Sequence, residues 1–299
     1  MGLFSRLVVT TMPLVPRFLV YRVARHYVAG ETREDALATV ARLNGEGAWA
    51  TLDVLGEEVS DRTRATEGVE EYLRLLEDIG EQGLQANISV KPTMLGLKID
   101  EDFCRDNIER LVQAAAERDS FVRIDMEDRT TTDATLRIYR ELKERHGHVG
   151  TVLQAYMRRT LTDIGELPAE GTNIRLCKGI YVEPMEHSWK GYETVRHNYV
   201  QALDKLFRQG VYVGIATHDE YLVCAAEALI DRHGLNPDQY EFQMLLGVTP
   251  DLRRTLIRRG HHLRVYVPYG PDWYPYSRRR MRENPEIASH VMRATVFGR

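Results

Sequence analysis

The chain has 299 residues and a formal net charge of −4, with 43% apolar and 28% charged residues. These proportions exclude a disordered or fibrous protein and predict a packed globular core. The negative net charge argues against nucleic acid as a partner, because proteins that bind duplexes carry a broad basic surface. The three cysteines show no C-x-x-C spacing, which predicts neither a disulfide framework nor a thiolate zinc site and favours a reducing, cytoplasmic location.

The N-terminal segment is apolar and basic: residues 1–28 contain four arginines and no acid. Three interpretations remain open, namely a helical arm packed on the domain, a segment lying on a membrane surface, and a cleaved signal. No stretch of the chain approaches the roughly 20 apolar residues that a membrane helix needs. We expect an N-terminal helical arm over residues 1–45 and a catalytic barrel over residues 46–299.

Short apolar, β-rich runs recur along the rest of the chain and alternate with segments of helical periodicity, several of which end in glycine. The runs are residues 48–56, 86–92, 120–127, 150–156, 173–181, 211–219, 240–247 and 263–270. Eight strand-then-helix units in about 250 residues predict an α/β protein with a (βα)8 TIM-type barrel. A doubly wound dinucleotide-binding sheet would need a glycine-rich turn after an early strand, and the sequence has no G-x-G-x-x-G motif.

Polar residues follow the predicted strands at the carboxyl end, where barrel enzymes place their chemistry. They are Asp53, Lys91, Asp125, Gln154, Arg175, Lys178, Thr217, His218, Asp219, Gln243 and Tyr266. We expect a cationic mouth with few acids, suited to a polyanionic cofactor and an anionic substrate. A lysine at a strand end also serves as a Schiff-base nucleophile in other enzymes, so a class I aldolase that uses Lys91 or Lys178 is an alternative.

The run "YPYSRRRMRENPE" over residues 274–286 holds four arginines. A helix over 275–284, with Pro275 in its first turn, divides them into two pairs. One face carries Tyr276, Arg279, Arg280 and Glu283, which stand at i, i+3, i+4 and i+7. Arg278 and Arg282 fall on the opposite side and are expected to face water. The shared face predicts a site for a small carboxylate or phosphate.

Two further kinds of site are disfavoured by the sequence. Asp125, Glu127 and Asp128 suggest a metal site with His218, but no second histidine lies at a matching strand end, so we expect no metal. A Ser-His-Asp hydrolase is equally disfavoured, because no G-x-S-x-G elbow is present.

The ordered motifs resemble the proline dehydrogenase family over residues 26–290. The arginine run matches the family signature Y-x-x-R-R-x-x-E, and seven strand-end motifs follow the family order: "TLDVLGE", "SVKP", "RIDMED", "RLCKGIY", "ATHD", "EFQMLLG" and "VYVPYG". The resemblance is to the stand-alone bacterial form, because no aldehyde dehydrogenase segment follows. It implies a distorted barrel that oxidises L-proline to Δ1-pyrroline-5-carboxylate with FAD, the first step of proline catabolism, and passes the electrons to a quinone-type acceptor.

The resemblance also implies roles for individual residues. The substrate-binding set is Lys91, Tyr266, Tyr276, Arg279, Arg280 and Glu283. The catalytic residues are Asp125, which lies beside the substrate and flavin, and Tyr181, which walls the proline ring together with Tyr266 and Tyr276. The cofactor-binding set is Met126, Gln154, Arg175, Lys178, Gly179, Ile180, Thr217 and His218, with Arg175 approaching the flavin ring near its reactive nitrogen. Expected partners are L-proline, a quinone, a Δ1-pyrroline-5-carboxylate dehydrogenase and, by peripheral contact, the inner face of the membrane.

Overall fold

The computed structural model of the chain describes residues 24–168, 170–274 and 276–277. Its eight strands form one closed parallel barrel in which each strand pairs with its neighbours in the sequence and β1 pairs with β8. The strands are β1 (Trp49–Val54), β2 (Ala86–Val90), β3 (Val122–Ile124), β4 (Val149–Gln154), β5 (Asn173–Cys177), β6 (Tyr212–Ala216), β7 (Tyr240–Leu245) and β8 (Leu263–Tyr269). Seven strands lie within runs that the sequence predicted, and β4 begins one residue before its run, so the (βα)8 barrel is confirmed.

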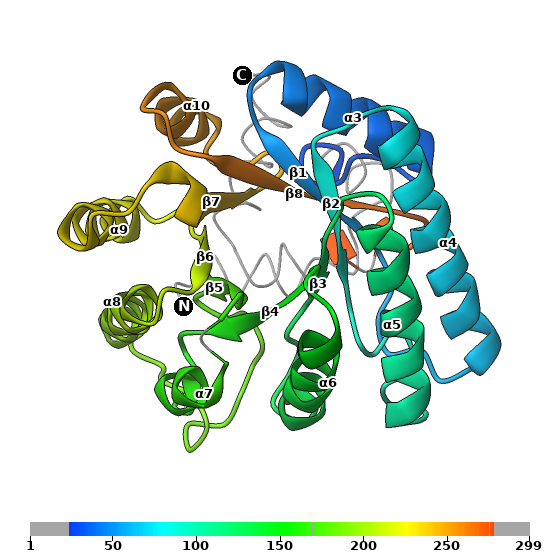
Figure 1. Cartoon of the computed structure of the whole chain (residues 1–299), viewed down its shortest axis with the longest axis horizontal. Helices are drawn as coiled ribbons and strands as arrows, with labels where there is room; N and C mark the ends of the chain where they lie inside the picture. Colours follow the sequence, from blue (N-terminus) through cyan, green and yellow to red (C-terminus); the bar gives the residue numbers. More distant parts are fainter. Residues whose placement is uncertain (1–23, 169, 275, 278–299) are drawn as a thin grey trace, which may run out of the picture.

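Helices surround the barrel on its outside (Figure 1). They are α3 (Arg33–Gly45), α4 (Arg62–Glu81), α5 (Glu101–Ala116), α6 (Thr132–Arg145), α7 (Thr160–Glu166), α8 (Tyr192–Arg208), α9 (Glu220–His233) and α10 (Pro250–Arg258), with a 3-10 turn η2 (Pro237–Gln239) before β7. Their ends follow local rules: the Asp61 side chain accepts from the amides of Thr63 and Arg64 at the start of α4, and Gly234 ends α9 with φ 63°. None of the helices in the described ranges has the length and apolar character needed to cross a bilayer.

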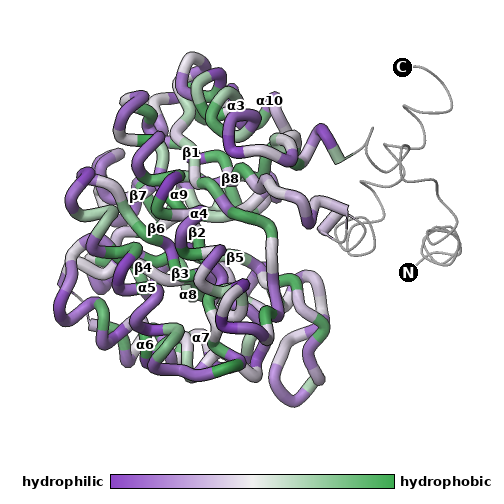
Figure 2. Tube along the Cα trace, turned by 90° about the vertical axis from the view of Figure 1, so that its right-hand side faces the viewer, coloured by the Kyte–Doolittle hydropathy of each residue, from purple (hydrophilic) through white to green (hydrophobic). Residues whose placement is uncertain are grey.

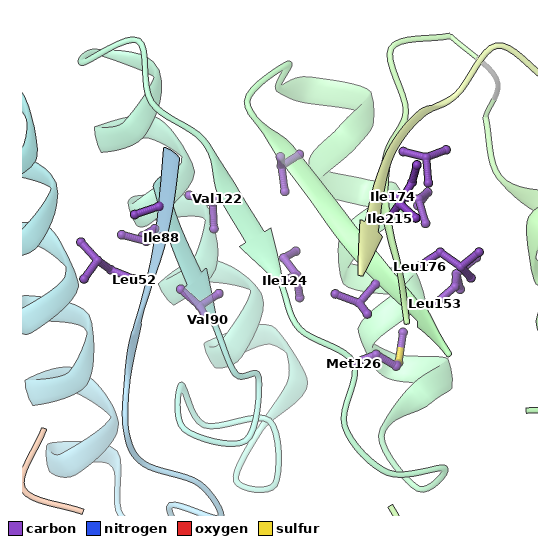
Figure 3. Close-up of a cluster of buried hydrophobic side chains, with 14 of the residues drawn as sticks. Leu52, Ile88, Val90, Val122, Ile124, Met126, Leu153, Ile174, Leu176 and Ile215 are labelled. Carbon is purple, nitrogen blue, oxygen red and sulfur yellow. The ribbon is translucent and has the colours of Figure 1, made fainter. Parts of the chain in front are cut away.

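Apolar side chains of the strands face the surrounding helices. Leu52, Ile88 and Ile124, among others labelled in Figure 3, belong to one buried cluster that includes helix residues such as Leu76 and Ile108. Figure 2 shows the same layering, with hydrophobic stretches along the strands and hydrophilic ones on the outer helices and loops. The barrel is therefore held from outside by a continuous apolar layer, which provides the main driving force for folding.

Alternate side chains of each strand point into the barrel, and in this structure many of these inward side chains are polar. Arg175 of β5 donates to Ser89 of β2, and Tyr266 of β8 donates to Asp125 just after β3. These strands are not neighbours in the closed sheet, so their hydrogen bonds cross the interior. Barrel interiors are more often filled by branched apolar side chains. The polar filling here leads directly to the carboxyl end, where the predicted site residues lie.

Of the predicted N-terminal arm, the structure describes residues 24–45, which include helix α3. Its buried residues Ala36, Val40 and Leu43 belong to the same core as the barrel strands. Thr32 and Asp35 form a capping box that fixes where α3 begins. Residues 1–23 of the predicted arm lie outside the described residues.

Candidate active site

A cavity of about 1080 Å³ opens at the carboxyl ends of the strands. The residues to which the family resemblance gave a role all line it, where described: Lys91, Asp125, Met126, Gln154, Arg175, Lys178, Gly179, Ile180, Tyr181, Thr217, His218, Tyr266 and Tyr276. Asp53, which was also expected at the strand ends, is fully buried and is not part of the cavity lining. Arg279, Arg280 and Glu283 lie outside the described residues. The sequence had assigned these side chains to the ends of six different strands or the segments after them, and the closed barrel brings them to one mouth.

Lys91, just after β2, forms a buried ion pair with Asp53 of β1. Its Nζ lies 2.5 Å from Asp53 Oδ2 and 3.2 Å from the Tyr266 hydroxyl. Lys91 is 6% exposed and Asp53 is fully buried. Burial alone would lower the pKa of Lys91, but the charge of Asp53, and then that of Asp125, outweighs burial and raises it above its ordinary value. A Schiff-base nucleophile must be a neutral amine, so this pairing works against an aldolase role for Lys91.

Arg175 of β5 and Asp125 form a second pair inside the cavity. Arg175 Nη1 donates to Asp125 Oδ1 at 2.7 Å, and Ser89 Oγ donates to the same oxygen at 2.7 Å. The Tyr266 hydroxyl donates to Asp125 Oδ2 at 3.2 Å, and the Arg175 guanidinium lies over the Tyr266 ring. Asp125 therefore links Arg175 to Tyr266, so these three side chains are held as one unit.

The rim of the cavity is organised around Asp219, the residue that caps α9. Its carboxylate accepts from Lys178 Nζ at 3.0 Å, from the Tyr192 hydroxyl at 2.9 Å, and from Arg196 at 2.7 and 2.8 Å. Burial would raise the pKa of Asp219, but the hydrogen bonds from Arg196 and Lys178 lower it well below its usual range. Asp219 thus stays ionised and holds two cations at the cavity entrance.

Sequence reasoning missed Tyr192, Arg196 and Tyr221, which also line the cavity. The Arg196 guanidinium lies 4.3 Å from the Tyr192 ring centroid and 4.8 Å from that of Tyr221. A signal for the first two was present, because they stand at i and i+4 at the start of α8 and so share one face. Nothing local pointed to Tyr221, which enters the site from α9.

The expectation of a cationic mouth with few acids is wrong for the described residues. Four acids line the cavity together with its four lysines and arginines. The acids are Glu57, Asp125, Asp219 and Glu220, and the cations are Lys91, Arg175, Lys178 and Arg196. A charge buried without a partner is costly, so most of these cations are paired with carboxylates that other strands or loops contribute.

Two local contacts fix the backbone around the cavity. Gly179, directly after β5, has φ +102°, and a Cβ built there would lie 2.0 Å from Cδ1 of the Tyr156 ring. On the neighbouring strand end, His218 Nε2 accepts from the amide of Leu245 at 2.9 Å. That contact leaves the proton of a neutral imidazole on Nδ1. The segments after β5 and β6 are therefore held in place by packing and by a backbone hydrogen bond.

Glu127, one of the acids considered for a metal, is occupied by Thr93. Its carboxylate accepts from the Thr93 amide at 2.9 Å and from the Thr93 hydroxyl at 2.6 Å. Across the described part of the chain, no three His, Cys, Asp or Glu side chains are grouped so as to hold a metal ion. The role of Glu127 is therefore to fix the turn after β2, next to Lys91.

Glu127 also predicts a pH dependence of stability, because burial raises its pKa to about 7. The folded protein binds this proton more tightly than the unfolded chain, so the contribution of Glu127 is fully present below about pH 4.5 and is lost as the pH rises through about 7. We expect up to about 3 kcal/mol of unfolding free energy to be lost over this window. Denaturant unfolding at pH 5 and pH 8 checks this: relative to wild type, Glu127→Gln should gain stability at pH 8, and an equal offset at both pH values would contradict the prediction.

Comparisons with known proteins identify the family. The family model described as proline dehydrogenase matches residues 36–293. Proline dehydrogenase of Deinococcus radiodurans is 36% identical over 283 residues, which cover 93% of this chain and 91% of that protein. Proline dehydrogenase 2 of Bacillus subtilis is 37% identical over 258 residues, which cover 86% of this chain and 85% of that protein.

Solved structures of proline utilization A (PutA) share the fold. PutA from Bdellovibrio bacteriovorus, inactivated by N-propargylglycine, has a TM-score of 0.83 at 22% identity and is matched over 88% of this chain and 33% of that one. PutA from Corynebacterium freiburgense has a TM-score of 0.78 at 20% identity, over 97% of this chain and 34% of that one. The chain thus spans about a third of these larger proteins, and at this identity they establish the barrel alone. The family match over most of the length, with relatives that align almost end to end, shows that the chain belongs to the proline dehydrogenase family.

Proposed function

We propose that the protein oxidises L-proline to Δ1-pyrroline-5-carboxylate with bound FAD, the first step of proline catabolism, and that a quinone-type acceptor takes up the electrons. One observation carries the proposal: the side chains that the family resemblance assigns to substrate and cofactor, where described, all line one cavity. Family membership implies a flavin-dependent enzyme, and FAD is the form that we propose.

The residues present suit FAD in size and chemistry. The cavity volume of about 1080 Å³ lies at the upper end of the range for small-molecule sites, as a dinucleotide requires. Lys178 and Arg196 at the rim are suited to the pyrophosphate charge, and Gln154 and Thr217 offer polar groups deeper in the cavity. When bound, the flavin supplies a two-electron acceptor for the hydride on the carbon beside the proline nitrogen.

The remaining work falls to side chains that bind and orient the substrate. We assign Lys91, with Arg279 and Arg280, to the proline carboxylate, and Tyr181, Tyr266 and Tyr276 to the walls around the ring. Each charge-assisted contact contributes roughly 1.5–3 kcal/mol. Asp125 holds Arg175 and Tyr266 in place beside the reacting carbon. Correct orientation converts this binding energy into rate, because the reacting atoms are then held close together.

The test is a flavin spectrum. The purified protein, reconstituted with FAD and freed of oxygen, should show the visible absorbance of an oxidised flavin, and L-proline should bleach it. A protein that stays colourless after FAD addition, or whose absorbance is unchanged by proline, contradicts the proposal. Borohydride trapping of a substrate on Lys91 or Lys178 would instead favour the aldolase.

The arginine run gives a second prediction. Tyr276 is buried, lines the cavity, and donates its amide to the Asp272 carbonyl at 3.4 Å as in a helix. If the helix continues, Arg279 and Arg280 share the Tyr276 face and Arg278 does not. Arg279→Met is therefore expected to raise the proline Kd by about 10- to 100-fold with little change in FAD affinity. Arg278→Met is the matched control. Equal losses of proline affinity in the two variants would contradict the assignment of Arg278 and Arg279 to different faces of the helix.

The location and the partners are proposed on sequence grounds. The basic, apolar segment over residues 1–28 supports a peripheral contact between a cytoplasmic protein and the inner face of the membrane, where the quinone would be reduced. A Δ1-pyrroline-5-carboxylate dehydrogenase is the proposed recipient of the product. Flotation with anionic liposomes tests the membrane contact, and binding that survives removal of residues 1–28 would contradict it.

A further inference from the structure

A line of hydrogen-bonded side chains runs through the barrel interior to Arg175. Arg264 Nε on β8 donates to Glu241 Oε1 on β7 at 2.7 Å. Gln243 Nε2, two residues further along β7, donates to the same Glu241 oxygen at 2.5 Å, and Gln243 Oε1 accepts from Arg175 Nε at 2.6 Å. Glu241 and Gln243 are 2% and 5% exposed, so solvent offers few alternative partners. The family resemblance assigned no role to either residue.

The ion pair at the start of this line fixes the orientation of the Gln243 amide. Burial would raise the pKa of Glu241, but the charge of Arg264 and the hydrogen bonds from Arg264 and Gln243 lower it below its ordinary value. An ionised carboxylate only accepts hydrogen bonds, so the amide NH2 of Gln243 must face Glu241. If the Gln243 amide were flipped, its oxygen would face the Glu241 carboxylate oxygen and its NH2 group would face the N–H of Arg175 Nε. Both contacts would then be repulsive. The Gln243 carbonyl oxygen therefore always faces Arg175.

Arg175 is in turn fixed at two of its three nitrogens. Gln243 holds Nε, and Asp125 and Ser89 hold Nη1. Among the described residues Nη2 makes no hydrogen bond, and Arg175 lines the cavity. We propose that Glu241 and Gln243 are positioning residues that hold the Arg175 guanidinium so that Nη2 is presented to the bound flavin. This inference rests on the proposed function for the identity of the group that Nη2 meets.

Gly214 of β6 provides the space for this arrangement. A Cβ built at Gly214 would lie 2.4 Å from Gln243 Nε2 and 2.8 Å from its Cδ. The backbone of Gly214 does not have a positive φ, so alanine could adopt it without backbone strain. Gly214→Ala therefore displaces Gln243 without changing its chemistry, and it offers a second way to disturb the same contact.

Gln243→Met is the principal variant, because it preserves length and volume but removes both hydrogen bonds. We expect proline to reduce the flavin about 10- to 100-fold more slowly, with the proline Kd and the FAD Kd much less affected. Tyr212→Phe is the matched control, since Tyr212 contacts Glu241 through Oε2 and not through the oxygen that Gln243 uses. It should leave the reduction rate within about twofold of wild type. Equal slowing in both variants overturns the proposal.

A double-mutant cycle separates positioning from general damage. If Gln243 acts through Arg175, adding Gln243→Met to Arg175→Met should slow reduction by no more than about twofold beyond Arg175→Met alone. If the double variant instead reduces the flavin more slowly by the product of the two single fold-changes, the substitutions act independently and the proposal is overturned. Should Gln243→Met fail to fold, Gly214→Ala takes its place in the cycle with the same expected outcomes.

A measurement on the flavin-free protein keeps this proposal distinct from the proposed function. With 15N-labelled arginine, the Nε–H proton of Arg175 should exchange slowly with water in wild type and in Tyr212→Phe, because Gln243 holds it in a buried bond. Exchange should become fast in Gln243→Met. Slow exchange that persists in Gln243→Met overturns the positioning role, whereas a wild-type flavin that proline does not bleach contradicts only the proposed function.

Discussion

Lys91→Met is expected to lower the free energy of unfolding by about 3–5 kcal/mol, because it leaves the fully buried carboxylate of Asp53 without its cation. The loss should grow with pH. Burial already raises the pKa of Asp53, and removing Lys91 raises it further, so that the folded variant binds a proton that the unfolded chain releases. Denaturant unfolding across pH 5 to 8 measures both effects. A variant as stable as wild type at pH 8 would mean that the pair does not support the fold.

The double variant Lys91→Met with Asp53→Asn separates stability from substrate binding. Removing both charges takes away the unpaired buried carboxylate, so most of the lost stability should return. Proline binding should not return, because the proposed carboxylate partner is still missing, and a Kd about 10- to 100-fold above wild type is expected. Recovery of proline affinity in the double variant would show that Lys91 is structural and does not bind the substrate.

Gly179→Ala is expected to disrupt the segment that follows β5. The added methyl group would overlap the Tyr156 ring at 2.0 Å, and φ +102° is a strained conformation for any residue with a Cβ. The Tyr156 amide donates to the Lys178 carbonyl at 2.8 Å, so a shift at Gly179 also moves the backbone beside the cavity. Strain that reaches the site should weaken FAD binding about tenfold for each 1.4 kcal/mol. The melting temperature of the protein should decrease as well. Fluorescence titration with FAD and a thermal melt check these outcomes.

Gly234→Ala is the matched control for Gly179→Ala. Gly234 also has a positive φ, +63°, but a Cβ there would meet nothing within 4 Å, and the residue ends α9 away from the cavity. This variant should lose about 1 kcal/mol of stability, because alanine is disfavoured in the left-handed conformation of Gly234, and it should keep its FAD affinity. If Gly179→Ala and Gly234→Ala weaken FAD binding equally, the effect arises from general destabilisation and not from the contact between Gly179 and Tyr156.

The barrel and the location of its cavity were predictable from the sequence because both depend on local patterns. Short β-rich runs are enough to predict the strands, and a 3.6-residue period that ends at a stop signal is enough to predict the helices. Because the parallel strands of a barrel all end on one face, the polar residues at the strand ends are then expected on that face. Lys91, Arg175 and His218 could be assigned to one mouth without any knowledge of what they contact. The division of the arginine run into two pairs rests on the same helical periodicity, and it stays a prediction.

The pairing of charges could not be predicted from the sequence. Lys91 meets Asp53 across 38 positions, and Arg175 meets Asp125 across 50. Among the described residues, the expected excess of positive charge at the mouth is not found for this reason. The strand-end motifs show which residues reach the mouth, but they do not show which of them form ion pairs.

The sequence by itself therefore determined the strand order, the type of fold and the residues that reach the carboxyl face, because spacing along the chain controls these properties. Only the tertiary structure decided that the barrel interior is polar, that Asp219 holds Lys178 and Arg196 at the rim, and that Glu241 orients Gln243 toward Arg175. These contacts join segments that are brought together only when the barrel closes. Their energies depend on distance and burial, which a linear pattern does not contain.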